Sequence, residues 1–226
     1  MQRPDNRSTL ARRQLLAGVA GLPLAAFGRA GLAQAGSRAP TPSQTLGPFY
    51  PRNPAERPRE TDADLLAVEG QRVLAQGVPI FLVGRVLNRR GEPVGGAAVE
   101  IWQCDAQAVY HHPAGGAEGE RDPGFQGYGI DRTADSGEFR FRTIRPVPYP
   151  GRTAHIHVRV RPQTGSTLAT QLYLGDSPDN ARDFLFSRLS PQEQRQLLLA
   201  FEPTTQITHP LARDTRFTAR IDLVLA

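Results

Sequence analysis

The sequence predicts an all-β fold: a β-sandwich of mixed sheets with a short helical insertion before its last strand and an extended N-terminal arm. Three observations support this prediction. Glycine and proline are plentiful, with 22 and 20 among 226 residues, which suits many turns between short strands. Several segments alternate apolar and polar residues with the period of a strand. Only one segment carries a convincing helix signature.

The strand signal is clearest near the C-terminus, where Phe217, Ala219 and Ile221 alternate with polar residues. Between the predicted strands, residues 104–136 are rich in glycine and predict a long loop. A loop of this length inside a compact domain is usually functional or wrongly assigned. The predicted strands are 80–87, 97–103, 138–144, 151–160, 167–174 and 217–225.

The helical insertion is predicted from Ser190-Pro-Gln-Glu193, which has the form of a capping box with proline at the first helical position. We expect this helix to continue to Phe201 and a shorter one to cover residues 180–189. No internal repeat is present. The predicted organisation is therefore a signal peptide (1–35), an N-terminal arm (36–78) and one sandwich domain (79–226).

The first 35 residues resemble a twin-arginine export signal. Arg12 and Arg13 precede a modest apolar run that ends at Phe27, and Ala33-Gln-Ala35 is a small-residue cleavage site. The run is interrupted by two glycines and a proline, so it is too short for a membrane span. A general secretory signal is the alternative. We expect export to the periplasm and no membrane attachment of the mature form.

The charge balance argues against nucleic-acid binding. The whole chain has a formal charge of +5, but residues 1–35 hold five of the 27 basic residues and one of the 22 acidic ones. Their removal leaves a net charge of +1. Every basic residue is arginine, which excludes lysine chemistry. The single cysteine, Cys104, excludes an intramolecular disulfide and cysteine-based metal clusters, and we expect it in the core.

Two histidines draw attention because they lie two residues apart on a predicted strand. Side chains alternate between the faces of a strand, so His155 and His157 share one face with Arg159. Such a pair binds one metal ion or, equally well on spacing alone, forms hydrogen bonds at a strand edge. Which interpretation holds depends on the other side chains that could bind a metal beside the two histidines.

Tyrosine is the other candidate donor. Tyr149 lies between Pro148 and Pro150, which restrict the local backbone and aim the ring. Tyr110 begins the glycine-rich region, although the adjacent His111 or His112 could take its place. Imidazole together with phenolate suits ferric iron better than zinc or copper.

Several ordered motifs resemble one known family, the intradiol ring-cleavage dioxygenases, and in particular the protocatechuate 3,4-dioxygenase β-subunit type. The likeness covers roughly residues 41–190. The segment between Tyr149 and the histidines is shorter than in the β-subunits, and no long helical N-terminal domain precedes the sandwich. The motifs are Trp102-Gln-Cys-Asp105, Tyr110, Phe139-Arg-Phe-Arg-Thr-Ile144, Pro148-Tyr-Pro-Gly-Arg152, His155-Ile-His157 and Thr170-Gln-Leu-Tyr173.

The resemblance implies a β-sandwich enzyme with a non-haem Fe(III). Its activity would be ring cleavage of a catechol-type aromatic, such as protocatechuate, with O2 to a cis,cis-muconate-type dicarboxylate. Tyr149 would also accept a substrate proton, and Arg152 would stabilise developing negative charge. The implied metal ligands are Tyr110, Tyr149, His155 and His157, and the implied substrate contacts are Gly47, Pro48, Tyr50 and Gln171.

Two alternatives remain from the sequence. One is another metal-dependent oxidase on the same sandwich. The other is a transthyretin-like binding module that has the fold without the chemistry. The sequence leaves open the particular catechol and allows a homo-oligomer.

Overall fold

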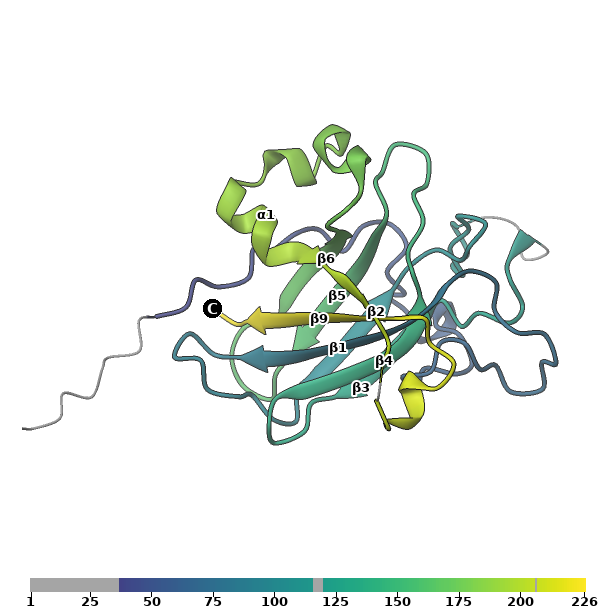
Figure 1. Ribbon diagram of the computed structural model, residues 1–226, viewed down its shortest axis with the longest axis horizontal. Coiled ribbons are helices and arrows are strands. Elements are labelled where there is room, and N and C mark those ends of the chain that lie inside the picture. Colours follow the sequence, from purple (N-terminus) through teal and green to yellow (C-terminus); the bar gives the residue numbers. More distant parts are fainter. Residues whose placement is uncertain (1–36, 116–119, 206) are drawn as a thin grey trace, which may run out of the picture. The chain divides into compact units, whose positions relative to one another are not determined.

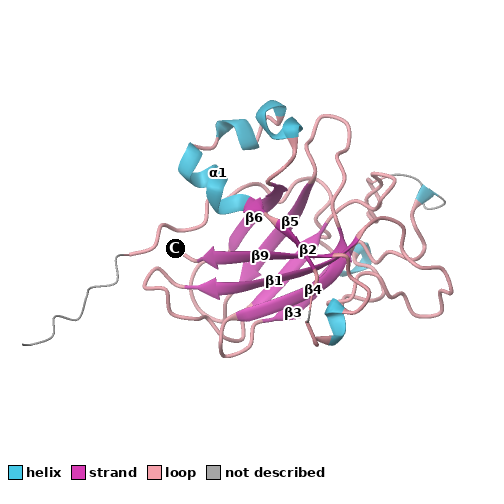
Figure 2. Ribbon diagram, in the orientation of Figure 1, coloured by secondary structure: helices cyan, strands magenta, loops and turns pink. Residues whose placement is uncertain are grey.

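The computed structural model describes residues 37–115, 120–205 and 207–226, so the predicted signal peptide lies outside the described residues. Two β-sheets and one short α-helix form the described part (Figures 1 and 2). The predicted fold class is therefore confirmed. No helix among these residues is both long enough and apolar enough to cross a membrane.

Both sheets are mixed. In the four-stranded sheet the order is β4-β1-β9-β8, and β1 runs parallel to β9. In the five-stranded sheet the order is β3-β2-β5-β6-β7, and β6 runs parallel to β7. The strands are β1 (Pro79–Leu87), β2 (Ala98–Trp102), β3 (Tyr128–Arg132), β4 (Glu138–Ile144), β5 (His155–Arg161), β6 (Leu168–Leu174), β7 (Leu198–Leu199), β8 (Phe201–Pro203) and β9 (Phe217–Val224).

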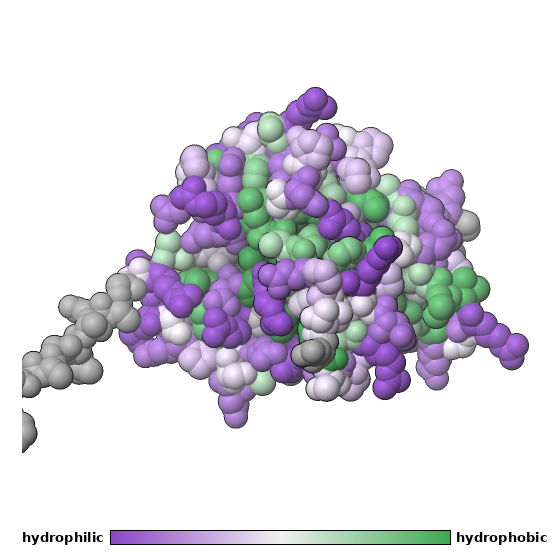
Figure 3. Space-filling view, viewed as in Figure 1, coloured by the Kyte–Doolittle hydropathy of each residue, from purple (hydrophilic) through white to green (hydrophobic). Residues whose placement is uncertain are grey.

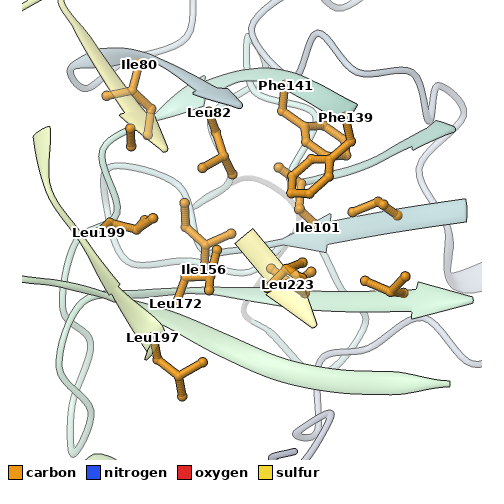
Figure 4. Packing of buried hydrophobic residues seen from close by; sticks show 14 of the residues in the cluster. Ile80, Leu82, Ile101, Phe139, Phe141, Ile156, Leu172, Leu197, Leu199 and Leu223 are labelled. Carbon is orange, nitrogen blue, oxygen red and sulfur yellow. The ribbon is translucent and has the colours of Figure 1, made fainter. Parts of the chain in front are cut away.

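The main hydrophobic core lies between the inner faces of the two sheets. Figure 4 shows Ile101, Ile156 and Leu172 from the five-stranded sheet among side chains of the other sheet, such as Leu82 and Phe141. All five are fully buried. Hydrophilic side chains cover much of the outer surface in the view of Figure 3. The alternation seen in the sequence therefore reports the inner and outer faces of the sheets.

The helical insertion lies beside β6 and contains α1 (Pro191–Leu197) after two 3₁₀ turns, η3 (Pro178–Arg182) and η4 (Phe186–Arg188) (Figure 1). The Ser190 capping box is present, with the hydroxyl accepting from the Glu193 amide. The helix ends before Leu198 rather than at Phe201, because Leu198 and Leu199 pair with β6. The expected helix over residues 180–189 is wrong, since 3₁₀ turns take its place.

Strand β3 falls inside the segment predicted as a long loop. Gly129 interrupts its apolar pattern, which hides the strand in the sequence. Glycine is needed there because a Cβ would lie 2.5 Å from the carbonyl oxygen of Asp62 and 2.6 Å from a methyl carbon of Leu65. The arm therefore packs directly against this strand.

The outer face of the five-stranded sheet carries three of the predicted site residues, His155, His157 and Gln171. Strand register places Trp102 opposite His157, His157 opposite Gln171, and His155 opposite Tyr173. The N-terminal arm, which contains the 3₁₀ turn η1 (Pro54–Glu56), is hydrogen-bonded to the edge of this sheet. The Gln44 amide donates to the Ala169 carbonyl at 2.7 Å. Another 3₁₀ turn, η5 (Pro210–Ala212), precedes β9.

Candidate metal centre

His155 and His157 point their Nε2 atoms at the same place. These two atoms are 3.2 Å apart, and both side chains are buried. The Nδ1 atom of His155 lies 2.6 Å from the carbonyl oxygen of Thr153. A carbonyl only accepts, so Nδ1 carries the proton and Nε2 presents its lone pair. His155 is thus held in the tautomer that a metal requires.

Burial also keeps both imidazoles neutral. Desolvation lowers the pKa of His155 to about 4, and the nearby Arg152 guanidinium adds to this effect. Desolvation and the neighbouring His155 lower the pKa of His157 further below its usual range. Neutral imidazole is the ligand form, so the site favours a metal over protons at neutral pH.

Tyr110 and Tyr149 complete the cluster. The two phenol rings meet edge to face with centroids 5.6 Å apart. The Tyr149 ring centroid lies 5.5 Å from His155, and that of Tyr110 lies 6.2 Å from His157. Tyr149 projects from a turn in which Gly151 has a φ of +84°, a conformation that favours glycine.

The donor set fits a metal ion. The Tyr110 hydroxyl is buried and has no hydrogen-bond partner among the described residues, which is costly unless something else binds it. Burial raises the pKa of both phenols, so each stays protonated until a cation draws off the proton. Within the described residues no group of three or more His, Cys, Asp and Glu side chains could hold a metal. Any metal at the two histidines would therefore depend on the phenols.

The alternative ligands next to Tyr110 point elsewhere. The Nε2 atom of His111 is 3.3 Å from a carboxylate oxygen of Asp105, and that of His112 is 3.7 Å from a carboxylate oxygen of Glu56. Burial raises the pKa of the Cys104 thiol to about 12, so it stays protonated. The geometry favours Tyr110 as the fourth donor.

Arg152 lies beside the cluster in a fixed orientation. Its Nε donates to Asp183 at 2.8 Å and its NH2 group donates to Gln171 at 2.6 Å. The side chain is only 8% exposed. The ion pair with Asp183 holds the guanidinium close enough to lower the pKa values of the two histidines. No motif or spacing in the sequence marks Asp183 as part of the site.

The arm brings a different aromatic to the site from the one predicted. Phe49 stacks on Tyr110 with ring centroids 4.2 Å apart and meets Tyr149 at 6.3 Å. Gly47 lies against the His157 ring, where a Cβ would be 3.2 Å from Cε1. Pro48 between them is exposed. The Tyr50 hydroxyl instead faces a buried ionic network, so its proposed substrate contact has no support from this geometry.

That network lies behind the histidines. Glu100 is fully buried, and its Oε2 accepts from the hydroxyls of Tyr50 at 2.7 Å and Tyr128 at 2.9 Å. Arg161 donates to its other oxygen at 2.6 Å. The Tyr50 ring in turn packs on Trp102, which stacks on His157 with ring centroids 4.8 Å apart and an interplanar angle of 7°. The network thus supports the ring of one histidine through two aromatic contacts.

The lowered pKa of His155 predicts an acid-sensitive metal-free protein. Because the folded-state pKa of about 4 lies below the unfolded value near 6.5, the unfolded chain binds the proton first. The free energy of unfolding therefore has its full value above about pH 6.5 and falls by about 3 kcal/mol as the pH decreases to 4. Urea unfolding across this range should show a shallower pH dependence for His155→Gln than for the wild type. Equal slopes would contradict the prediction.

Comparisons with known proteins agree with this fold. A family model described as Dioxygenase matches residues 46–222. The protocatechuate 3,4-dioxygenase beta chain of Burkholderia cepacia is 35% identical over 144 residues, or 60% of this chain and 61% of that one. Catechol 1,2-dioxygenase of Candida albicans is 30% identical over 167 residues, or 65% of this chain and 51% of that one. The matches thus span between half and two thirds of these relatives.

A solved structure agrees as well. The dioxygenase domain of a carbohydrate-binding fusion protein from Streptomyces sp. SirexAA-E superposes with a TM-score of 0.60 at 30% identity, covering 83% of this chain and 98% of that one. The fold and the family model together place the chain in a class of β-sandwich proteins described as dioxygenases. The chain belongs to the intradiol ring-cleavage dioxygenase family.

Proposed function

We propose that the protein is a non-haem Fe(III) dioxygenase that opens the ring of a catechol-type aromatic with O2. The product is a cis,cis-muconate-type dicarboxylate that carries both oxygen atoms. The observation that carries the proposal is the convergence of two neutral histidines, the partly buried phenol of Tyr149 and the buried phenol of Tyr110, whose hydroxyl has no hydrogen-bond partner among the described residues. Tyr110, Tyr149, His155 and His157 would hold the iron.

Bound ferric iron would supply the Lewis acidity that ionises phenols and makes a chelated catechol electron-rich enough to react with O2. The chain's own residues bind and position the substrate. The Tyr149 phenol oxygen, once ionised, accepts a proton from a catechol hydroxyl. Arg152 lies beside Tyr149 and offers a fixed positive charge to the developing anion. Phe49, which stacks on Tyr110, adds an apolar ring beside the metal ligands where an aromatic substrate would bind.

The proposal is tested with protein loaded with ferric iron. We expect a visible phenolate-to-iron absorption band, and uptake of ¹⁸O2 with a catechol panel (catechol, protocatechuate, hydroxyquinol) should place two labelled atoms in a ring-opened dicarboxylate. A quinone product would instead indicate another metal-dependent oxidase. A wild-type protein that neither binds iron nor takes up O2 would indicate a binding module and contradict the proposal.

We further propose export to the periplasm by the twin-arginine route. The support is the Arg12-Arg13 pair, the interrupted apolar run and the Ala33-Gln-Ala35 site. Replacing both arginines by lysine should retain the full-length precursor in the cytoplasm. If the variant is processed like the wild type, the general secretory route is indicated instead. If the wild type itself is not processed, the protein is not exported and the proposal is contradicted.

A further inference from the structure

Asp183 is a buried carboxylate outside both sheets, in the connection between η3 and η4. Its side chain is 0% exposed, and burying such a charge is costly unless its oxygens are fully hydrogen-bonded. The proposed reaction leaves it without a role. Its neighbours Arg182 and Phe184 are exposed, so the side chain of Asp183 points inward between two that point outward.

Four N–H groups converge on this carboxylate. Its Oδ2 accepts from Arg152 Nε at 2.8 Å and from the Thr153 amide at 3.0 Å. Its Oδ1 accepts from the amides of Leu185 at 3.0 Å and Phe186 at 2.9 Å. Asp183 therefore joins the helical insertion to the turn that leads into β5.

Thr153 passes this constraint on to the metal centre. Its hydroxyl lies 3.0 Å from both the Asn180 side-chain oxygen and the Ser177 hydroxyl. Its carbonyl oxygen accepts from Nδ1 of His155 at 2.6 Å. The residue that selects the tautomer of His155 is thus itself held by the insertion at its amide and its side chain.

We propose that Asp183 is a positioning residue that orients Arg152 directly and His155 through Thr153. The inference rests on the proposed function, since it assigns Asp183 a role in iron binding and in the binding of the catechol-type substrate. One carboxylate then fixes the positions of both Arg152 and His155. Both contacts depend on the insertion, which lies beside β6 (Figure 1).

The chemistry of the four partners makes the carboxylate hard to replace. All four are donors, and an ionised carboxylate is acceptor-only. An asparagine has one oxygen, so in either orientation its NH2 group would face two of the four N–H donors. It would also leave the largely buried guanidinium of Arg152 without its counter-ion.

The test is Asp183→Asn in the full chain, with Asp176→Asn as the matched control. Asp176 lies in the same insertion and pairs with Arg145 at 2.8 Å, but its side chain is 66% exposed. We expect Asp183→Asn to weaken Fe(III) binding about 10- to 100-fold in a chelator competition, since partners of metal ligands have effects of this size. It should also shift the phenolate-to-iron band and raise the KM for catechol. The control should stay within about 2-fold of wild type by each measure.

Urea unfolding of the metal-free proteins separates positioning from a purely structural role. A destabilised Asp183→Asn protein with wild-type iron affinity and spectrum would overturn the inference. If Asp183→Asn does not fold, Asp183→Glu carries the test: it keeps the charge but displaces it by one methylene. Weaker iron binding by a stably folded Asp183→Glu supports the inference, and wild-type binding overturns it.

The outcomes also distinguish this inference from the proposed function. A wild-type protein that binds iron but cleaves no catechol would refute the function, while the effect of Asp183→Asn on iron affinity could still be present. A wild-type enzyme that cleaves catechol, with an unaffected Asp183→Asn variant, would refute only the role of Asp183.

Discussion

Tyr149→Phe should lower the turnover of a catechol substrate by about 100- to 10,000-fold, the range typical for loss of a positioned acid or base. The substitution removes the phenol oxygen that we propose binds iron and accepts the substrate proton. It leaves the ring, which packs edge-on against Tyr110 and Phe49. The phenolate-to-iron band should weaken or shift, and stopped-flow measurements should show slower proton loss from bound catechol.

Tyr128→Phe is the matched control for this variant. The Tyr128 hydroxyl is also buried, but it donates to Glu100 at 2.9 Å on the far side of Trp102 from the histidines. Its loss should cost about 1 to 2 kcal/mol of unfolding free energy and leave the spectrum unchanged. Tyr149→Phe should show the opposite pattern. Equal spectra for Tyr149→Phe and wild type would place the ligand elsewhere.

The sequence predicted those parts of the site that depend on local geometry. The spacing of His155 and His157 requires them to share a strand face, and the flanking prolines of Tyr149 mark a constrained turn. Both features survive in the structure as a shared orientation of the two Nε2 atoms and a turn directly before β5. Local periodicity likewise predicted most of the sandwich.

The parts that escaped prediction depend on contacts between distant segments. Asp183 reaches Arg152 across 31 residues, and Glu100 meets Tyr50 across 50. Nothing in the local sequence distinguishes either carboxylate from one on the surface. The different positions of Phe49 and Tyr50 have the same origin, because the fold decides which ring of an adjacent pair turns toward the site.

The largest stability effect is expected for Glu100→Ala, at about 2 to 6 kcal/mol of unfolding free energy, because two buried hydroxyls each lose an acceptor at a cost of about 1 to 3 kcal/mol. The substitution removes the shared acceptor of two buried hydroxyls and of Arg161. Arg161 remains 43% exposed and can turn to water, so most of the cost comes from Tyr50 and Tyr128. Urea unfolding of the metal-free protein measures the change.

Glu138→Ala provides the comparison at the surface. Glu138 is also a strand glutamate paired with an arginine, with 2.6 Å between the charged atoms of Glu138 and Arg140, but both side chains are about one-third exposed. Pairs of this kind contribute about 0 to 1 kcal/mol, so this variant should unfold close to the wild type. A similar loss for both variants would show that burial of Glu100 is not what makes it important.

A triple variant identifies the physical cause. If hydroxyl protons left without an acceptor dominate the cost of Glu100→Ala, then adding Tyr50→Phe and Tyr128→Phe should restore part of the lost stability, because removing both partners of a buried hydrogen bond costs less than removing one. The Tyr50 hydroxyl also accepts from Arg159, so Tyr50→Phe removes that contact and the recovery is only partial. Further destabilisation by these two changes would contradict this explanation. Since Tyr50 packs on Trp102 and Trp102 on His157, the spectrum of the iron-loaded triple variant also reports how far the network supports that ligand. If the triple variant regains stability but its spectrum still differs from that of the wild type, then the ionic network, rather than the aromatic packing, holds the imidazole in place.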